Sequence, residues 1–239
     1  MELQGLNDLL VFKFDKDGKL LTDESKGGLT TNIGKDGVFK IDLESSKGAT
    51  QANITGLSRT AQAVYGSNAK AEQHFGAYQI TGTFGANDIP HNFYDSIVGL
   101  EKDSKLGFGN MAKDSTPLAY GGVIAHSYNS NIGVDLYFAL PYGNLTPGGD
   151  LTMGTDTENP TLVHDTFTLN AAARPSDGLV YEKFYSDEDG FDFDKMITWI
   201  ISGTVAGSGT EDPTHKGSNS AASQGIASQG TTPSSSTTH

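Results

Sequence analysis

Histidine, the side chain best suited to acid–base and metal chemistry, is scattered singly along the sequence. Catalysis or metal binding needs several such groups to converge, and the sequence has no HExxH, GxSxG or Walker motif and no histidine pair at helical spacing. The six histidines are His74, His91, His126, His164, His215 and His239. We interpret the first four as surface or hydrogen-bonded residues of a β-protein. We predict no catalytic, cofactor-binding or metal-binding residues and no enzymatic activity.

Two acidic segments are candidates for cation binding. Asp15, Asp17 and Gly18 hint at a calcium loop, but the other ligands of the EF-hand spacing are missing, so a hairpin turn is the favoured interpretation. The run Asp187-Glu188-Asp189-Gly190 offers several carboxylates. A run of this kind is more often a solvated loop than a metal site.

Two further patterns carry chemistry in other proteins. Asp165 and Glu182 could form the carboxylate pair of a hydrolase, yet nothing in the sequence places them together. The segment Gly107-Phe108-Gly109-Asn110-Met111-Ala112 resembles part of a dinucleotide-binding loop. Such a loop must follow a strand and open a helix, whereas this segment follows a predicted helix, so we exclude it.

Composition excludes several classes of function. Without cysteine the chain has no disulfides and no thiolate metal site. The formal net charge of -13 argues against ordinary nucleic-acid binding, because phosphate would be repelled. The sequence shows neither a signal-peptide pattern nor 18 consecutive apolar residues, so we expect synthesis in the cytoplasm and no membrane span. The 30 glycines suit many short strands joined by turns.

The elements that would position these residues are mostly strands. Apolar and polar residues alternate in five segments, which is typical of half-buried strands. The inward-facing sets are Phe39, Ile41 and Leu43; Tyr78, Ile80 and Phe84; Ile132, Val134, Leu136, Phe138 and Leu140; Phe167 and Leu169; and a fifth strand within Leu179 to Tyr185. Glycine-containing turns separate these segments and divide the chain into hairpins.

Residues 46–76 and two helical segments complete the chain. Residues 46–76 are small and polar, which predicts a long, protruding hairpin or loop. Residues 88–101 are predicted as a helix, capped by Asn87 or Asp88, with an apolar face made of Ile89, Phe93, Ile97 and Leu100. Phe191 to Ile201 could be a closing strand or a short helix capped by Asp192 or Asp194, and we favour the helix.

The composition changes near residue 203. Residues 203–239 are mostly Gly, Ser, Thr, Ala, Gln and Pro, and they cannot bury enough apolar area to offset the entropy of ordering. We therefore predict one domain over residues 1–202 and a flexible tail over residues 203–239. The charged residues of the tail are Glu211, Asp212 and Lys216, so its removal leaves a net charge of -12 on the domain.

Several segments resemble the major tail proteins, or tail tube proteins, of long-tailed bacteriophages of Gram-positive hosts. The strand-then-helix core and the segments after it carry the resemblance, which spans roughly residues 5–202. They are Gly76 to Pro90 (GAYQITGTFGANDIP), His91 to Leu100 (HNFYDSIVGL), Tyr120 to Ile124 (YGGVI), Val134 to Tyr142 (VDLYFALPY), Arg174 to Tyr185 (RPSDGLVYEKFY) and Asp189 to Asp192 (DGFD).

The resemblance implies a tail-tube-type β-sandwich or barrel with a flanking helix. It implies a structural virion protein whose hexameric rings stack into a hollow tube, beside tape measure and tail terminator proteins. Residues 46–76 would then serve as a stacking arm between rings, and the acidity would line a lumen through which DNA passes without binding.

A carbohydrate-binding β-sandwich for host adhesion is the alternative. Such a module would gather exposed aromatic residues in one groove. The candidates are Tyr120, Tyr128, Tyr137 and Tyr142.

Overall fold

The computed structural model describes residues 4–15, 17–23, 27–66, 69–102, 107–109, 119–129, 131–148 and 164–203. The predicted flexible tail, apart from Gly203, lies outside these residues.

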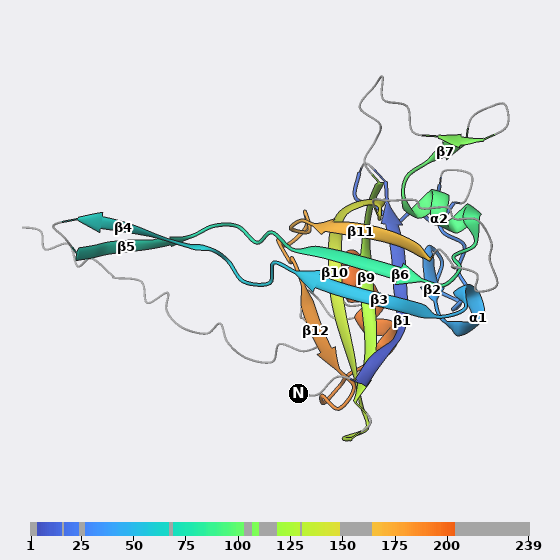
Figure 1. The fold of residues 1–239 in the computed structure, drawn as a ribbon. Helices are drawn as coiled ribbons and strands as arrows, with labels where there is room; N and C mark the ends of the chain where they lie inside the picture. The colour runs from blue at the N-terminus through green and yellow to red at the C-terminus, as the bar shows by residue number, and fades with distance from the viewer. Residues whose placement is uncertain are drawn as a thin grey trace, which may run out of the picture.

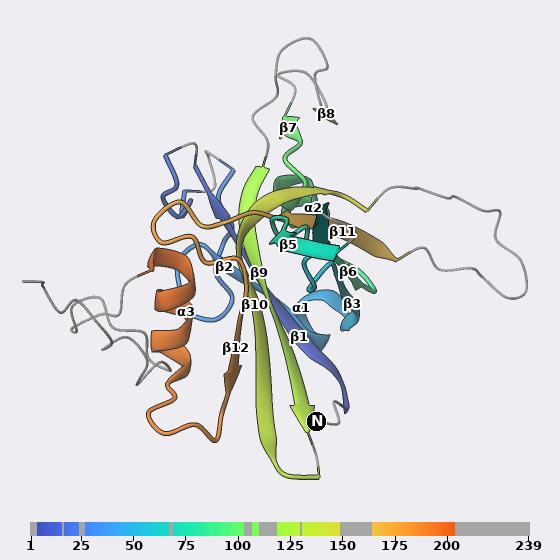
Figure 2. The same cartoon turned by 90° about the vertical axis from the view of Figure 1, so that its left-hand side faces the viewer.

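The body of the molecule is a three-layered, mainly β structure (Figures 1 and 2). The central layer contains five antiparallel strands in the order β2 (Val38–Ile41), β1 (Gln4–Phe14), β9 (Ala119–Asn129), β10 (Val134–Pro147) and β12 (Glu182–Tyr185). One face is covered by β11 (Asp165–Ala171), β6 (Thr81–Ala86), β3 (Ala49–Thr55) and the helix α2 (His91–Ile97). The helix α3 (Phe193–Ser202) covers the other face. This arrangement confirms the predicted sandwich-like fold with a flanking helix.

Strand β10 belongs to both β-layers. Its first part, Leu136 to Ala139, pairs with β12 in the central layer, and its last part, Gly143 to Pro147, pairs with β11. A register shift between Leu140 and Gly143 separates the two parts, as expected where a bulge bends a strand. The polypeptide therefore passes from one layer to the other without leaving the strand.

The central strands are buried on both faces. Leu9, Leu10, Val11 and Phe12 are each 0% exposed, with Leu9 and Val11 in the core below β6 and β11 and the other two in the core below α3. Strands enclosed in this way are apolar at every position and do not alternate. This is why alternation detected neither β1 nor β9, although the tail-protein resemblance included the start of β9.

The alternating segments fall in β2, β6, β10, β11 and β12, with two errors in the inward-facing sets. Leu43 is 79% exposed, because the chain turns at Asp42 into the short helix α1 (Leu43–Ser46). The Asp42 side chain accepts hydrogen bonds from the backbone amides of Glu44 and Ser45, which makes it an N-cap. Ile132 is 64% exposed in the turn before β10.

Helix α2 presents the predicted apolar face but has different ends. Ile89 and Ile97 are buried, and Phe93 stacks on Phe39 of β2 with ring centroids 4.1 Å apart. The helix spans His91–Ile97 rather than 88–101, and neither predicted residue caps it. Asp88 instead forms an ion pair with Lys47, and Asn87 donates to the carbonyl of the same lysine.

Helix α3 confirms the helical interpretation of residues 191–201. Asp192 is its N-cap, accepting a hydrogen bond from the Lys195 amide at 2.8 Å. At the other end, the buried guanidinium of Arg174 donates to the carbonyls of Trp199 and Ile200, at 2.7 Å each. Because a cation is favourable at a helix C-terminus, this contact fastens α3 to the loop that leads into β12.

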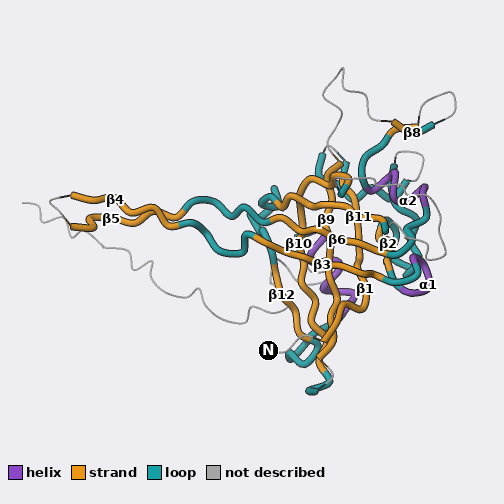
Figure 3. Tube along the Cα trace, viewed as in Figure 1, coloured by secondary structure: helices purple, strands orange, loops and turns teal. Residues whose placement is uncertain are grey.

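A long two-stranded hairpin projects from one side of the body (Figures 1 and 3). It consists of β4 (Ala61–Gly66) and β5 (Ala69–Phe75), which pair with each other. Residues 49–55 form β3 and pair with β6, so the projecting part begins later than residue 46. A short ribbon, β7 (Glu101–Lys102) with β8 (Phe108–Gly109), lies beyond α2. The ribbon contains the described part of Gly107–Ala112.

Candidate assembly surfaces

The hairpin carries apolar side chains that its own chain leaves exposed. Tyr65 is 74% exposed, Phe75 56%, Val64 48% and Leu57 38%. An isolated two-stranded hairpin is marginally stable in water, and large apolar groups on a projecting element are typical of an interaction site. These exposed groups make the hairpin a candidate surface for contact with another molecule.

The base of the hairpin is held in one geometry. A Cβ at Gly56, whose φ is +75°, would lie 1.9 Å from the carbonyl oxygen of Gln79. Only glycine therefore lets the two chain segments at the base of the hairpin approach this closely. Arg59 lies over the rings of Phe75 and Tyr78, 5.4 and 5.1 Å from their centroids. These contacts set the direction in which the hairpin leaves the body.

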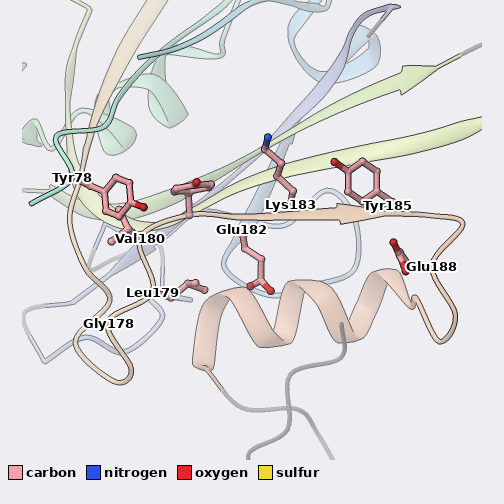
Figure 4. A pocket seen from close by; sticks show the side chains of 9 residues that line it. Tyr78, Gly178, Leu179, Val180, Glu182, Lys183, Tyr185 and Glu188 are labelled. Carbon is pink, nitrogen blue, oxygen red and sulfur yellow. The ribbon is translucent and has the colours of Figure 1, made fainter. Parts of the chain in front are cut away.

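A surface hollow of about 620 Å³ lies beside β12 and the loop before it (Figure 4). Tyr78, next to the base of the hairpin, forms part of its lining, and its ring meets that of Tyr181 edge to face at 5.9 Å. Half-buried Tyr181 and Tyr185 and exposed Lys183 also line it, and Glu188 contributes from the turn before α3. The hollow offers aromatic surface with charged groups at its margin.

Comparison with known proteins identifies the family. A family model described as a phage tail tube protein matches residues 1–208. The chain belongs to the phage tail tube protein family. A search of the curated proteins found no match.

Family membership gives this tail tube protein a structural role in the phage tail. It is a major tail protein that belongs in the virion, where it assembles with other copies of itself and with other tail components. Within the part of the chain that the structure describes, no helix has the length and apolar character needed to cross a membrane. The exposed apolar hairpin is consistent with assembly.

Four charged residues of the tail tube protein form a row across the central layer. Lys40 Nζ on β2 lies 3.3 Å from Asp8 Oδ2 on β1. The same carboxylate lies 3.0 Å from His126 Nδ1 on β9, and His126 Nε2 lies 2.9 Å from Asp135 Oδ1 on β10. Burial by itself lowers the pKa of His126, but the hydrogen bonds to the two carboxylates outweigh it and raise the pKa. The row therefore links β2, β1, β9 and β10, and its ion pairs are strongest when His126 is protonated.

A buried lysine joins β1 to α2 of the tail tube protein. The Lys13 ammonium donates to the carbonyl of Gly27 at 3.0 Å and to the carbonyl and hydroxyl oxygens of Ser96. The residue is 7% exposed, and burial lowers its pKa to about 8. No sequence motif marked this contact, because its partners lie 14 and 83 residues away.

The other three histidines in the described part of the chain do not join His126. His74 contacts Glu72 on the exposed hairpin at 3.1 Å. His91 is exposed at the start of α2, and His164 is exposed just before β11. Among the described residues no group of three or more His, Cys, Asp or Glu side chains is arranged to hold a metal ion.

The predicted carboxylate candidates have separate structural roles. Asp165 accepts a hydrogen bond from the Ile89 amide, whereas Glu182 accepts one from Trp199 Nε1 on the opposite side of the central layer, so the two do not form a catalytic pair. Asp15 accepts bonds from the amides of Asp17 and Lys19, which confirms the hairpin turn. Asp187 to Gly190 form the exposed turn before α3.

The four tyrosines proposed for a sugar-binding groove do not gather in one. Tyr120 stacks on Tyr142, with ring centroids 5.4 Å apart. Tyr137 is buried between His126 and Phe191, and Tyr128 lies near the far end of β9. Packing within the body accounts for three of the four.

Proposed function

We propose that this chain forms hexameric rings that stack into the tail tube of a long-tailed phage of a Gram-positive host. The stacked rings would form the conduit through which DNA enters the host cell. Membership of the tail tube family supports this proposal, and the observation that carries it is the hairpin with its exposed apolar residues. A single copy leaves Tyr65, Phe75 and Val64 largely in water, whereas a stacked ring would cover them.

The hairpin is the proposed stacking arm between successive rings. With β3 in the body, the projecting part of the predicted arm lies beyond residue 55. At about 3.3 Å per residue, strands of six or seven residues reach roughly 20 Å. That length suits contact with a neighbouring ring, and burial of the exposed apolar side chains would order the arm.

The acidity of the chain suits the wall of a DNA conduit. A net charge of -13 on each copy would repel phosphate, so DNA would slide without binding. We propose that the lumen of the tube is acidic. A map of the assembled tube with a basic lumen would overturn this part of the proposal.

Further proposals follow if the chain is a purely structural subunit. We propose that the chain has no enzymatic activity and needs no cofactor or metal. Its partners would be copies of itself, the tape measure and the tail terminator. Residues 203–239 would form a flexible appendage outside the assembly domain of residues 1–202, so deleting them would leave ring assembly intact.

The test is negative-stain electron microscopy of the concentrated, purified full chain, with sedimentation alongside. We expect rings or hollow tubes for the wild type. Replacing Val64 and Tyr65 with aspartate should abolish stacking into tubes, because the arm would then place charges in an apolar contact. Ile132→Asp is the matched control, since Ile132 is 64% exposed in the turn between β9 and β10, and that turn lies well away from the hairpin in Figure 1. A wild-type chain that remains a compact monomer would overturn the proposal.

A further inference from the structure

The hollow beside β12 lies next to the base of the hairpin, but the outer part of the hairpin cannot reach it within one copy. Tyr78 lines the hollow and lies close to the base of the hairpin. From that base the hairpin runs straight out from the body, and its far end, with β4 and β5, lies well away from β12 (Figure 1). Gly56 and Arg59 make close contacts at this base. An occupant with the hairpin's chemistry must therefore come from another molecule.

We propose that the hollow beside β12 receives the outer part of the β4–β5 hairpin of a second copy of this chain. This inference rests on the proposed stacking role of the hairpin and names the surface that the hairpin contacts. Three kinds of complementarity support it: aromatic surface, an available strand edge and charge.

The aromatic surfaces match in kind. The hollow presents Tyr78, Tyr181 and Tyr185, while the outer half of the hairpin presents Val64 and Tyr65. Tyr181 is also stacked flat on Phe138, with centroids 5.6 Å apart, which holds its ring in place. Aromatic rings favour offset or edge-to-face contacts with one another. Tyr65 would find such partners on a surface that is already rigid.

The strand edge is the second match. β12 pairs with β10, and no described strand pairs with the other edge of Lys183 to Tyr185. An open strand edge offers unpaired amides and carbonyls to an incoming strand. An extended hairpin is the element that can add to such an edge, with its side chains entering the adjoining hollow.

The charges provide the third match. Within residues 56–77 the charged residues are Arg59, Lys70 and Glu72, so this segment is slightly basic in a chain whose net charge is -13. Lys70, near the turn of the hairpin, donates to the neutral side chain of Gln73 rather than to a carboxylate. Glu188 lines the hollow within the exposed acidic turn at Asp187 to Asp189. Lys70 of one copy would face this turn of the next.

Cross-linking between two single-cysteine variants tests the contact, because the natural chain has no cysteine. One variant carries Tyr65→Cys and the other Lys183→Cys, and the two full-length proteins are mixed and oxidised. We expect a disulfide-linked dimer containing one of each. Ile132→Cys replaces Lys183→Cys in the control mixture, because Ile132 is also accessible but on a different surface, and it should give at least about tenfold less dimer.

Charge exchange provides a second, independent measurement. Lys70→Glu and Glu188→Lys should each raise the concentration needed for sedimentable assembly about fivefold. The double variant should return to within about twofold of the wild type, because it restores the pair with the signs exchanged. If the double variant lost as much assembly as the two single variants combined, the proposed pairing would be overturned.

The outcomes separate this inference from the stacking function itself. Tubes in the microscope without the disulfide-linked dimer of the Tyr65→Cys and Lys183→Cys variants would overturn the contact and leave the tube function standing. The dimer without tubes would support the contact between copies and overturn the tube function. Absence of both would overturn both proposals.

Discussion

The β4–β5 hairpin and the central layer use the same antiparallel pairing, but their side chains meet different surroundings. Leu9 to Phe12 are completely buried between two layers, whereas Tyr65 on the hairpin is 74% exposed. Burial of one large apolar side chain contributes about 1.5–3 kcal/mol, whereas one backbone hydrogen bond contributes only about 0.5–1.5 kcal/mol in net terms. We therefore expect the body to be stable as a single copy and the hairpin to depend on assembly.

The largest effect on stability should come from the body core. Phe84 is 0% exposed and packs against Phe167 with centroids 5.5 Å apart. Phe84→Ala should lower the free energy of unfolding by about 3–5 kcal/mol, because it removes buried area and leaves a cavity. Urea denaturation of the unassembled protein measures this. Tyr65→Ala is the matched hairpin variant, and a change above about 1 kcal/mol there would break the comparison.

The attachment of α3 should show the next largest effect. Arg174→Ala removes the buried guanidinium that donates to Trp199, Ile200 and Asp177. We expect a loss of about 2–4 kcal/mol, because the helix carbonyls and the carboxylate lose their partner. The same denaturation experiment tests it, with Arg59→Ala on the hairpin as control. A larger loss for Arg59→Ala would contradict the division between body and hairpin.

Alkaline pH should stabilise the body through Lys13. The folded state releases the Lys13 proton near pH 8, whereas the unfolded chain holds it to about its ordinary pKa of 10.5. The unfolded state therefore binds more protons between these values, and the free energy of unfolding should rise from pH 8 to 10 by about 2 kcal/mol. Lys13→Met should remove this rise. An unchanged slope in the variant would show that Lys13 is not its source.

The row of Lys40, Asp8, His126 and Asp135 should give the free energy of unfolding a smaller pH dependence in the opposite direction. The pKa of His126 is raised in the folded state, so its stabilising contribution is complete below its ordinary pKa of 6.5 and is lost as pH rises through the folded pKa. We expect roughly 1 kcal/mol, because the cost of burying the imidazolium offsets part of the gain from its two carboxylate partners. Unfolding at pH 6 and pH 8 measures the loss, which His126→Gln should abolish. A steeper loss in the variant would exclude the row as its origin.

The smallest effect on body stability and the sharpest effect on assembly should come from Gly56→Ala. The added Cβ would collide with the Gln79 carbonyl and force apart the two chain segments at the base of the hairpin. Because this point lies at the base of the hairpin, the free energy of unfolding should change by less than about 1 kcal/mol. Sedimentation should nevertheless show loss of tubes, since the hairpin would leave the body in another direction. Normal tubes would show that this direction does not matter.

The parts of the fold that depend on neighbouring residues were readable from the sequence. β11 and most of β10 alternate, Asp192 lies three residues before the amide that it caps, and the Asp15 turn closes within four residues. β1 gave no such signal because two layers cover it. Leu43 misled the pattern because β2 ends at Ile41 and Asp42 caps the helix α1, which begins at Leu43.

The candidate surfaces were readable only in part. The small, polar segment of residues 46–76 predicted a protruding hairpin or loop, but the apolar residues that make the hairpin a candidate interaction surface are few in that segment. The hollow joins Tyr78 to residues near 180, and no local pattern connects them. His126 was interpreted as a surface or hydrogen-bonded histidine, and its carboxylate partners could not be named from the sequence.

The β-rich class, the acidic charge, the turns and the presence of a projecting segment follow from the sequence alone, because each depends on composition or on residues within a few positions. Asp192 was one of two candidate caps for α3. The three-dimensional packing was needed to establish which strands are enclosed, where Arg174 and Lys13 attach their helices, how Asp8 reaches His126, and that the hollow lies at the base of the hairpin. These contacts join residues 25 to more than 100 positions apart. Such contacts follow from the packing of layers, which the order of residues along one strand does not contain.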